Sequence, residues 1–189
     1  MASISLKYKS KSGNLTAPGD VDPGAMIPIA TTTLSTSTAT ITFSDIPQNY
    51  EHIQIRGILK NSASGTYIKM QFNSDTGSNY SGHELSGDGS AASALGYSGR
   101  TDIPITPNGN TNVNFAGFIL DILDYANTNK YKTTKLLMGY DDNGSGRVML
   151  DSGSWRSTSG ITSISIAATS GTFQQYSQLA LYGIKRAGA

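Results

Sequence analysis

Hydrophobic and polar residues alternate along much of the chain after its first 25 residues. In the segment 38–43, Ile41 and Phe43 alternate with threonines, and the segments 51–59 and 66–72 repeat this pattern. A period of two places one row of side chains toward a core and the other toward solvent. These three segments are therefore predicted to be half-buried β-strands.

The second half of the chain carries five further strand candidates. The segment 114–125 is apolar at most positions, which is typical of a strand covered on both faces. A turn at 141–146 contains an Asn-Gly pair, the strongest short signal for a β-hairpin. The interval 73–114 is too long for a hairpin loop, so we expect it to carry short strands or a helical turn. The other four candidates are 133–140, 147–155, 161–167 and 177–185.

Eight strand candidates and no convincing helix predict an all-β protein. We expect an antiparallel β-sandwich, an eight-stranded jelly roll in the first instance, with a sandwich of another strand order as the alternative. Composition agrees with this fold class. Charged residues make up 14% of the chain, against roughly 25% in ordinary globular domains. Glycine, serine and threonine are abundant, which favours strands joined by turns over helices.

Residues 1–25 differ from the rest of the chain and predict an extended N-terminal arm ahead of a sandwich domain at 26–189. The segment 16–24 holds two prolines and two glycines, and the arm has little apolar surface to bury. Such a segment is either a disordered leader or an extended piece that becomes ordered on a partner surface. The arm residues expected to anchor the chain are Lys7, Tyr8, Lys9 and Lys11.

Charge and composition exclude several function classes. The net charge is +1 and no dense basic face is evident, so we expect no nucleic-acid binding. The chain has no cysteine, which excludes disulfides and thiol chemistry. Its first residues lack the apolar segment of a signal peptide. No apolar run approaches the roughly 18 residues of a spanning helix, so no membrane insertion is expected.

The segment 72–85 places oxygen-bearing side chains near the spacing of a calcium loop. Counting from Asn73, Asp75 and Glu84 take the third and twelfth places of an EF-hand loop. The place of the obligatory glycine is taken by Ser78, and the flanks are strand-like, so the EF-hand match fails. Asp75 and Glu84 stay as weak metal candidates. The main alternative is a turn that hydrogen-bonds to its own backbone.

Aromatic residues raise the possibility of a contact surface for a glycan or a protein partner. Sugar rings stack on aromatic faces while polar side chains bind their hydroxyls. Several tyrosines fall in predicted loops, and Trp155 lies at a strand end, where a core role is at least as plausible. The candidate glycan or partner contacts are Asn79, Tyr80, His83, Tyr97, Tyr125 and Tyr131.

No combination of residues indicates catalysis. The chain lacks the G-x-S-x-G nucleophile motif. His52 lies on the polar side of an alternating strand. Asp121 and Asp124 are predicted to point to opposite faces of one strand, whereas a glycosidase needs its two carboxyls across a cleft. We therefore expect no enzymatic activity and no cofactor.

Five segments together resemble structural proteins of tailed bacteriophages, particularly those of cyanobacterial and other marine hosts. The resemblance spans about residues 26–185 and leaves the arm uncovered. The five segments are IPQNYEHIQIRG (46–57), FNSDTGSNYSGHEL (72–85), DILDYANTNKYKT (121–133), GSWRSTSGITSI (153–164) and LYGIK (181–185).

This resemblance implies a β-sandwich on the virion exterior, in a tail fibre, a tail appendage or a head decoration, and it transfers no catalytic residues. We expect a non-enzymatic virion structural protein, made in the host cytoplasm, that docks through its arm onto a capsid, tail or fibre protein. Phage fibre and decoration proteins are often trimers, so the resemblance implies a homotrimer. The alternative is a receptor- or glycan-binding module at a tail-fibre tip.

Overall fold

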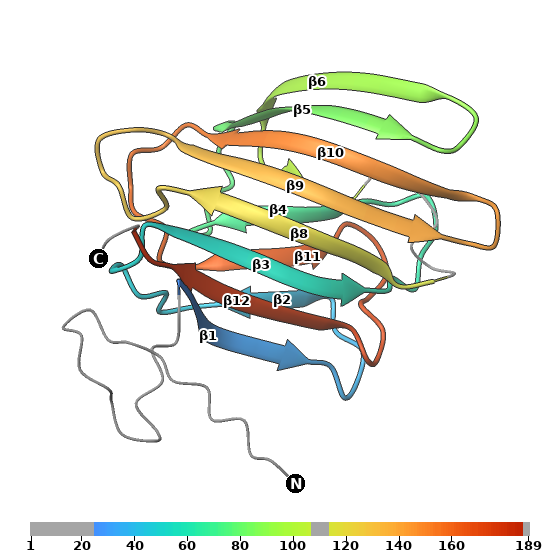
Figure 1. Ribbon diagram of the computed structural model, residues 1–189, viewed down its shortest axis with the longest axis horizontal. Helices are drawn as coiled ribbons and strands as arrows, with labels where there is room; N and C mark the ends of the chain where they lie inside the picture. The colour runs from blue at the N-terminus through green and yellow to red at the C-terminus, as the bar shows by residue number, and fades with distance from the viewer. Residues whose placement is uncertain (1–24, 107–113, 187–189) are drawn as a thin grey trace, which may run out of the picture.

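A computed structural model describes residues 25–106 and 114–186, and it confirms the predicted all-β sandwich. Two antiparallel sheets pack together (Figure 1). The larger sheet has the order β1-β12-β3-β8-β9-β10-β5-β6, and the smaller has the order β2-β11-β4-β7. The strands are β1 (Met26–Thr33), β2 (Thr40–Phe43), β3 (His52–Leu59), β4 (Ile68–Phe72), β5 (Tyr80–Gly87), β6 (Ala92–Arg100), β7 (Ile103–Pro104), β8 (Ala116–Leu123), β9 (Lys132–Asp141), β10 (Gly146–Trp155), β11 (Ile164–Ala168) and β12 (Gln178–Ile184).

The core lies between the two sheets because alternate residues of each strand face inward. On the smaller sheet, Ile41, Ile166 and Met70 lie side by side on β2, β11 and β4, and all are buried. Ile55 and Leu120 form the facing row on the larger sheet, next to Leu136. This is the period of two that the sequence predicts.

The structure has twelve strands in its described residues, where eight were expected. The eight candidates correspond to β2, β3, β4 and β8 to β12. The four others are β1 and β6 at the two edges of the larger sheet, the two-residue β7, and β5. β5 and β6 are rich in serine and glycine, so they lack an apolar alternation. Both come from the interval 73–114, where short strands or a helical turn were expected; they are strands of 8 and 9 residues.

The expectation that both faces of the segment 114–125 are covered is wrong. Ala116, Phe118, Leu120 and Ile122 face the core, but Ile119 on the opposite face is 37% exposed. No described element covers this outer face of the larger sheet. Figure 1 views the molecule from that side, with the smaller sheet behind.

The turn predicted at 141–146 joins β9 to β10. The β9–β10 hairpin turns as predicted through Asn143 and Gly144, whose φ angles are 59° and 101°, the left-handed region that this pair favours.

The arm residues Lys7, Tyr8, Lys9 and Lys11 lie outside the described residues, whereas β1 begins at Met26. Within the described part of the chain, no helix is long and apolar enough to cross a membrane.

Candidate functional site

Asp75, a metal candidate from the sequence, is the hydrogen-bonding centre of a turn. Its carboxylate accepts hydrogen bonds from the Gly77 amide at 2.8 Å, from Asn79 Nδ2 at 3.0 Å and from Trp155 Nε1 at 2.7 Å. These donors lower the pKa of Asp75, although its partial burial acts in the opposite direction. The carboxylate therefore ties the β4–β5 turn to the end of β10, which is a structural role.

Glu84, the second metal candidate, lies elsewhere. It stands in the middle of β5, directly opposite Asp151 on β10 and Leu95 on β6. Asp75 precedes that strand, in the turn beside Trp155. No group of three or more histidines and carboxylates that could hold a metal occurs among the residues that the structure describes.

Two of the predicted contact tyrosines are buried, which corrects their assignment to surface loops. Tyr80 is 0% exposed, and its hydroxyl accepts from the Phe72 amide at 3.1 Å and donates to the Asp75 carbonyl at 3.1 Å. Tyr125 is 0% exposed and donates to the Pro47 carbonyl. Neither ring can reach a ligand, because both are part of the core.

The other candidates remain accessible but do not converge on one site. Tyr131 is 52% exposed in the loop before β9. His83 points outward from β5, whereas Tyr97 lies on the inner side of β6. Asn79 is exposed and bonded to Asp75. The structure thus separates residues that the sequence grouped together.

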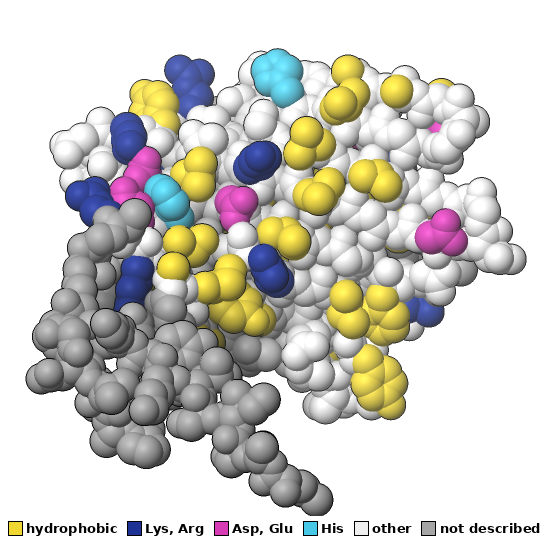
Figure 2. All heavy atoms as spheres, in the orientation of Figure 1, with side chains coloured by type: hydrophobic (Ala, Val, Ile, Leu, Met, Phe, Trp, Pro, Cys, Tyr) yellow, Lys and Arg dark blue, Asp and Glu magenta, His cyan; other side chains and the backbone are white. Residues whose placement is uncertain are grey.

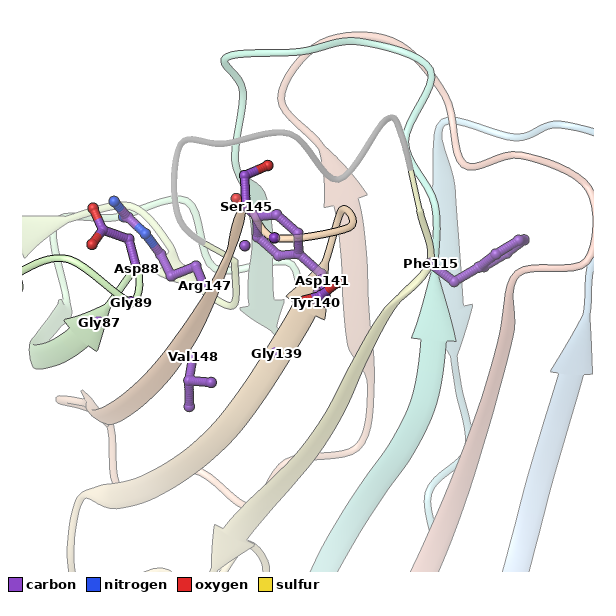
Figure 3. Close-up of a pocket in the computed structure, with 12 residues that line it drawn as sticks. Gly87, Asp88, Gly89, Phe115, Gly139, Tyr140, Asp141, Ser145, Arg147 and Val148 are labelled. Carbon is purple, nitrogen blue, oxygen red and sulfur yellow. The ribbon is translucent and has the colours of Figure 1, made fainter.

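A hollow of about 590 Å³ lies between the tips of the β5–β6 and β9–β10 hairpins (Figure 3). Figure 3 shows Asp88 and Arg147 close together on one side, and Phe115 pointing away on the other. The Asp88 carboxylate is occupied within its own turn by the amides of Ser90 and Ala91. Most of the remaining lining is glycine and turn backbone. This hollow brings few side chains together, and we assign it no chemistry.

A second cleft is built from charged and aromatic side chains. It lies where β5 and β6 extend past β7, the last strand of the smaller sheet, and it has a volume of about 290 Å³. We call it the overhang cleft. It is lined by Tyr67, Glu84, Ser93, Ala94, Leu95, Tyr97, Arg100, Pro104, Thr106 and Arg147.

Arg100 is held between two rings in the wall of the overhang cleft. Its guanidinium carbon lies 5.1 Å from the ring centre of Tyr67 and 5.5 Å from that of Tyr97, within cation–π range. It forms a 2.7 Å ion pair with Asp102, which is 4% exposed. The Tyr67 hydroxyl completes the network, accepting from Arg100 at 2.8 Å and donating to Asp102 at 3.2 Å. Arg100, Asp102 and Tyr67 therefore hold one another in place in this wall.

Tyr97 is fixed by a second buried carboxylate. Its hydroxyl donates to Asp151, which is 2% exposed, at 3.2 Å. The ring crosses Gly82, where a Cβ atom would lie 2.3 Å from the Tyr97 hydroxyl. Burial raises the pKa of Asp151 to about 7, although the Tyr97 hydrogen bond acts in the opposite direction. Any larger residue at position 82 would displace the ring.

The outer face of the larger sheet carries a row of exposed aliphatic side chains. Ile119, Leu137, Leu150 and Leu85 lie next to one another across β8, β9, β10 and β5. Their exposed fractions run from 37% to 54%. We call this the apolar row. Figure 2, which shows this face, has hydrophobic side chains gathered across its middle.

A polar row runs parallel to the apolar row, one pleat away. It consists of Asp121, Lys135, Ser152 and His83 on the same four strands. On the other side of the apolar row, Val148 is 60% exposed beside Gly139. The face therefore combines an aliphatic centre with charges of both signs at its border.

Most of these residues could not be identified from the sequence. Tyr67, Arg100, Asp102 and Asp151 were not among the candidate residues, and Tyr97 was expected in a loop. The one local signal was the Arg-x-Asp spacing at 100–102. The positions of the other residues depend on which strands are neighbours.

In comparisons with known proteins, no family model matches this chain, and no curated protein matches it.

Proposed function

We propose that this chain is a non-enzymatic structural subunit of a phage virion, located on the particle exterior. Its resemblance to tailed-phage structural proteins supports the virion setting. The observation that carries the proposal is the apolar row, where four neighbouring aliphatic side chains on one sheet face are more than a third exposed. Contiguous apolar patches on soluble proteins mark interaction surfaces. An assembly subunit needs such a surface.

The partner of the apolar row is proposed to be a second copy of the chain. A twofold axis parallel to the strands, midway between β9 and β10, would place Leu137 on the partner's Leu150 and Ile119 on the partner's Leu85. The same operation sets Asp121 opposite the partner's His83 and Lys135 opposite the partner's Ser152. No like charges of these two rows then meet, and Val148 faces the partner's Gly139. The face is thus self-complementary, as a twofold interface requires.

The test is the mass of the full chain in solution, measured by light scattering, for the unchanged protein and for Leu137→Glu. The proposal predicts two copies for the former and one for the latter. Lys69→Glu on the outer face of the smaller sheet serves as the control and should keep two copies. A threefold assembly was expected from the resemblance, so a mass of three copies would contradict the twofold pairing. A monomeric unchanged chain would also contradict it.

Docking of the arm onto a capsid, tail or fibre protein is a separate part of the proposal and rests on the composition of residues 1–25. Particles lacking this chain would be mixed with the full chain or with a chain lacking residues 2–25. Reduced incorporation of the shortened chain would support anchoring by the arm. Equal incorporation would remove the arm from the proposal.

A further inference from the structure

We propose that the overhang cleft binds one neutral sugar ring of a glycan. The cleft faces the side of β5 and β6 opposite to the apolar row, because Glu84 and its neighbour Leu95 line the cleft, whereas Leu85, the next residue of β5, lies on the outer face. The proposal is therefore independent of the pairing described above. The volume of the overhang cleft, about 290 Å³, is close to the lower limit for ligand pockets, which range from about 300 to 1,000 Å³. One ring fits this size better than a larger ligand.

The walls are fixed before any ligand arrives. Asp102 holds Arg100 and Tyr67, and Asp151 holds Tyr97, through hydrogen bonds and an ion pair of 2.7 to 3.2 Å. Burying two carboxylates under a surface cleft is unfavourable unless each is paired. Here both carboxylates serve to orient side chains of the cleft wall. Walls fixed in this way lower the entropic cost of binding.

The charge pattern of the cleft points to a neutral ligand. The positive charge of Arg100 is already met by Asp102 and by the two rings that enclose it. Glu84 and Arg147 line the cleft from neighbouring strands and have opposite charges, and the Arg147 side chain also lies beside Asp88 at the hairpin tips (Figure 3). An anionic ligand would meet Glu84, and a cationic one would meet Arg147. A neutral molecule with several hydroxyl groups can donate to Glu84 and accept from Arg147 at once.

The cleft also has an apolar side suited to a sugar ring. Leu95, which is 59% exposed, stands on β6 two residues before Tyr97, and Pro104 lies across from it on the smaller sheet. A pyranose has C–H groups on one face and hydroxyls around its rim. The C–H groups can pack against Leu95 and Pro104, and the hydroxyls can bind Glu84 and Arg147. This combination identifies a neutral hexose as the ligand class.

The experiment titrates the full chain with the methyl glycosides of glucose, galactose and mannose, and with methyl glucuronide as the anionic counterpart. Binding is followed by saturation-transfer NMR. We expect at least one neutral glycoside to bind and the glucuronide to bind at least tenfold more weakly. Glu84→Ala and Leu95→Lys should each weaken binding at least tenfold. Tyr176→Ala and Arg56→Ala, outside the cleft, should leave it unchanged.

Unfolding midpoints measured on the same samples separate loss of binding from loss of folding. Leu95 is exposed, so Leu95→Lys fills the cleft without disturbing the core. Absence of binding by all three neutral glycosides would overturn the proposal. So would stronger binding of the glucuronide, or binding that Glu84→Ala and Leu95→Lys leave intact. If Leu137→Glu no longer formed pairs but still bound the sugar, pairing and sugar binding would be shown to be independent.

Discussion

Tyr97 on the edge strand β6 donates its hydroxyl hydrogen bond to the carboxylate of Asp151, which lies two strands away on β10. The ring can span this distance because Gly82 on the intervening β5 has no side chain. One aromatic residue thereby ties the outermost strand to the body of the larger sheet. It also forms a wall of the overhang cleft, so packing and the proposed binding depend on the same contact.

The first prediction concerns the pH dependence of stability. The pKa of Asp151 is raised from 3.8 to about 7 in the folded state, chiefly by burial. Between these values the folded chain holds a proton that the unfolded chain has lost, so the free energy of unfolding falls as pH rises from about 4 to 7. The fall is at most about 4 kcal/mol, since one pKa unit is about 1.4 kcal/mol. Asp151→Asn should remove this fall, as measured by urea unfolding at several pH values.

Asp88 provides a control of opposite sign. Backbone amides of Ala91 and Ser90 lower its pKa to about 2. Its contribution to stability is therefore present above pH 4 and is lost as pH falls toward 2. Asp88→Asn should leave the slope between pH 4 and 7 as it is. Equal slopes in the unchanged protein and Asp151→Asn would contradict the assignment of Asp151.

The second prediction separates a structural from a contact role for Tyr80. Its ring packs against Phe72 and Trp155, with ring centres 6.3 and 6.4 Å away. Tyr80→Ala should lower the free energy of unfolding by about 3–5 kcal/mol, as for other buried aromatic residues. Tyr80→Phe removes two hydrogen bonds to backbone atoms and should cost about 1–2 kcal/mol.

Tyr176 is the matched surface tyrosine, 67% exposed. Tyr176→Ala should change the free energy of unfolding by no more than about 0.5 kcal/mol. Urea unfolding of the three variants tests this ranking. If Tyr80→Ala were as stable as Tyr176→Ala, the ring could not be part of the core.

The third prediction concerns the buried ammonium of Lys132. It donates to the carbonyl oxygens of Asn127, Lys130 and Thr158, and the residue is 0% exposed. Lys132→Met should destabilise the fold by about 1–3 kcal/mol, because those carbonyls lose their common donor. Lys130→Met breaks only the exposed pair with Asp124 and should cost about 0–1 kcal/mol. Thermal unfolding of both variants measures the difference, and a reversed order would contradict this role.

Much of the fold follows from the sequence because alternation and turn chemistry act locally. Ile41 and Phe43 face the core as their spacing predicts, and Asn143-Gly144 forms the expected hairpin turn. β5 and β6 could not be predicted in this way, because a strand with an uncovered side does not need apolar residues at every second position. The outer face at Ile119 was wrongly expected to be covered. An apolar residue in a central strand suggests a second covering layer, and none of the described elements supplies it.

The site residues could not be predicted to the same extent. Arg100 and Asp102 are two positions apart, but the enclosing rings of Tyr67 and Tyr97 come from elsewhere in the chain. The register of β5 on β6 shifts between Tyr80 and Gly82, and such an irregularity decides which side chains meet. Asp151 looks like an exposed strand residue until its neighbours are known.

The most direct test of the central claim, pairing through the apolar row, uses the absence of cysteine from the chain. Chains carrying only Leu137→Cys would be mixed with chains carrying only Leu150→Cys and oxidised, with Tyr176→Cys chains as the control. Pairing about the proposed axis predicts that a disulfide-linked dimer of one chain of each kind forms faster than any dimer containing Tyr176→Cys. Equal rates for all combinations would contradict the pairing.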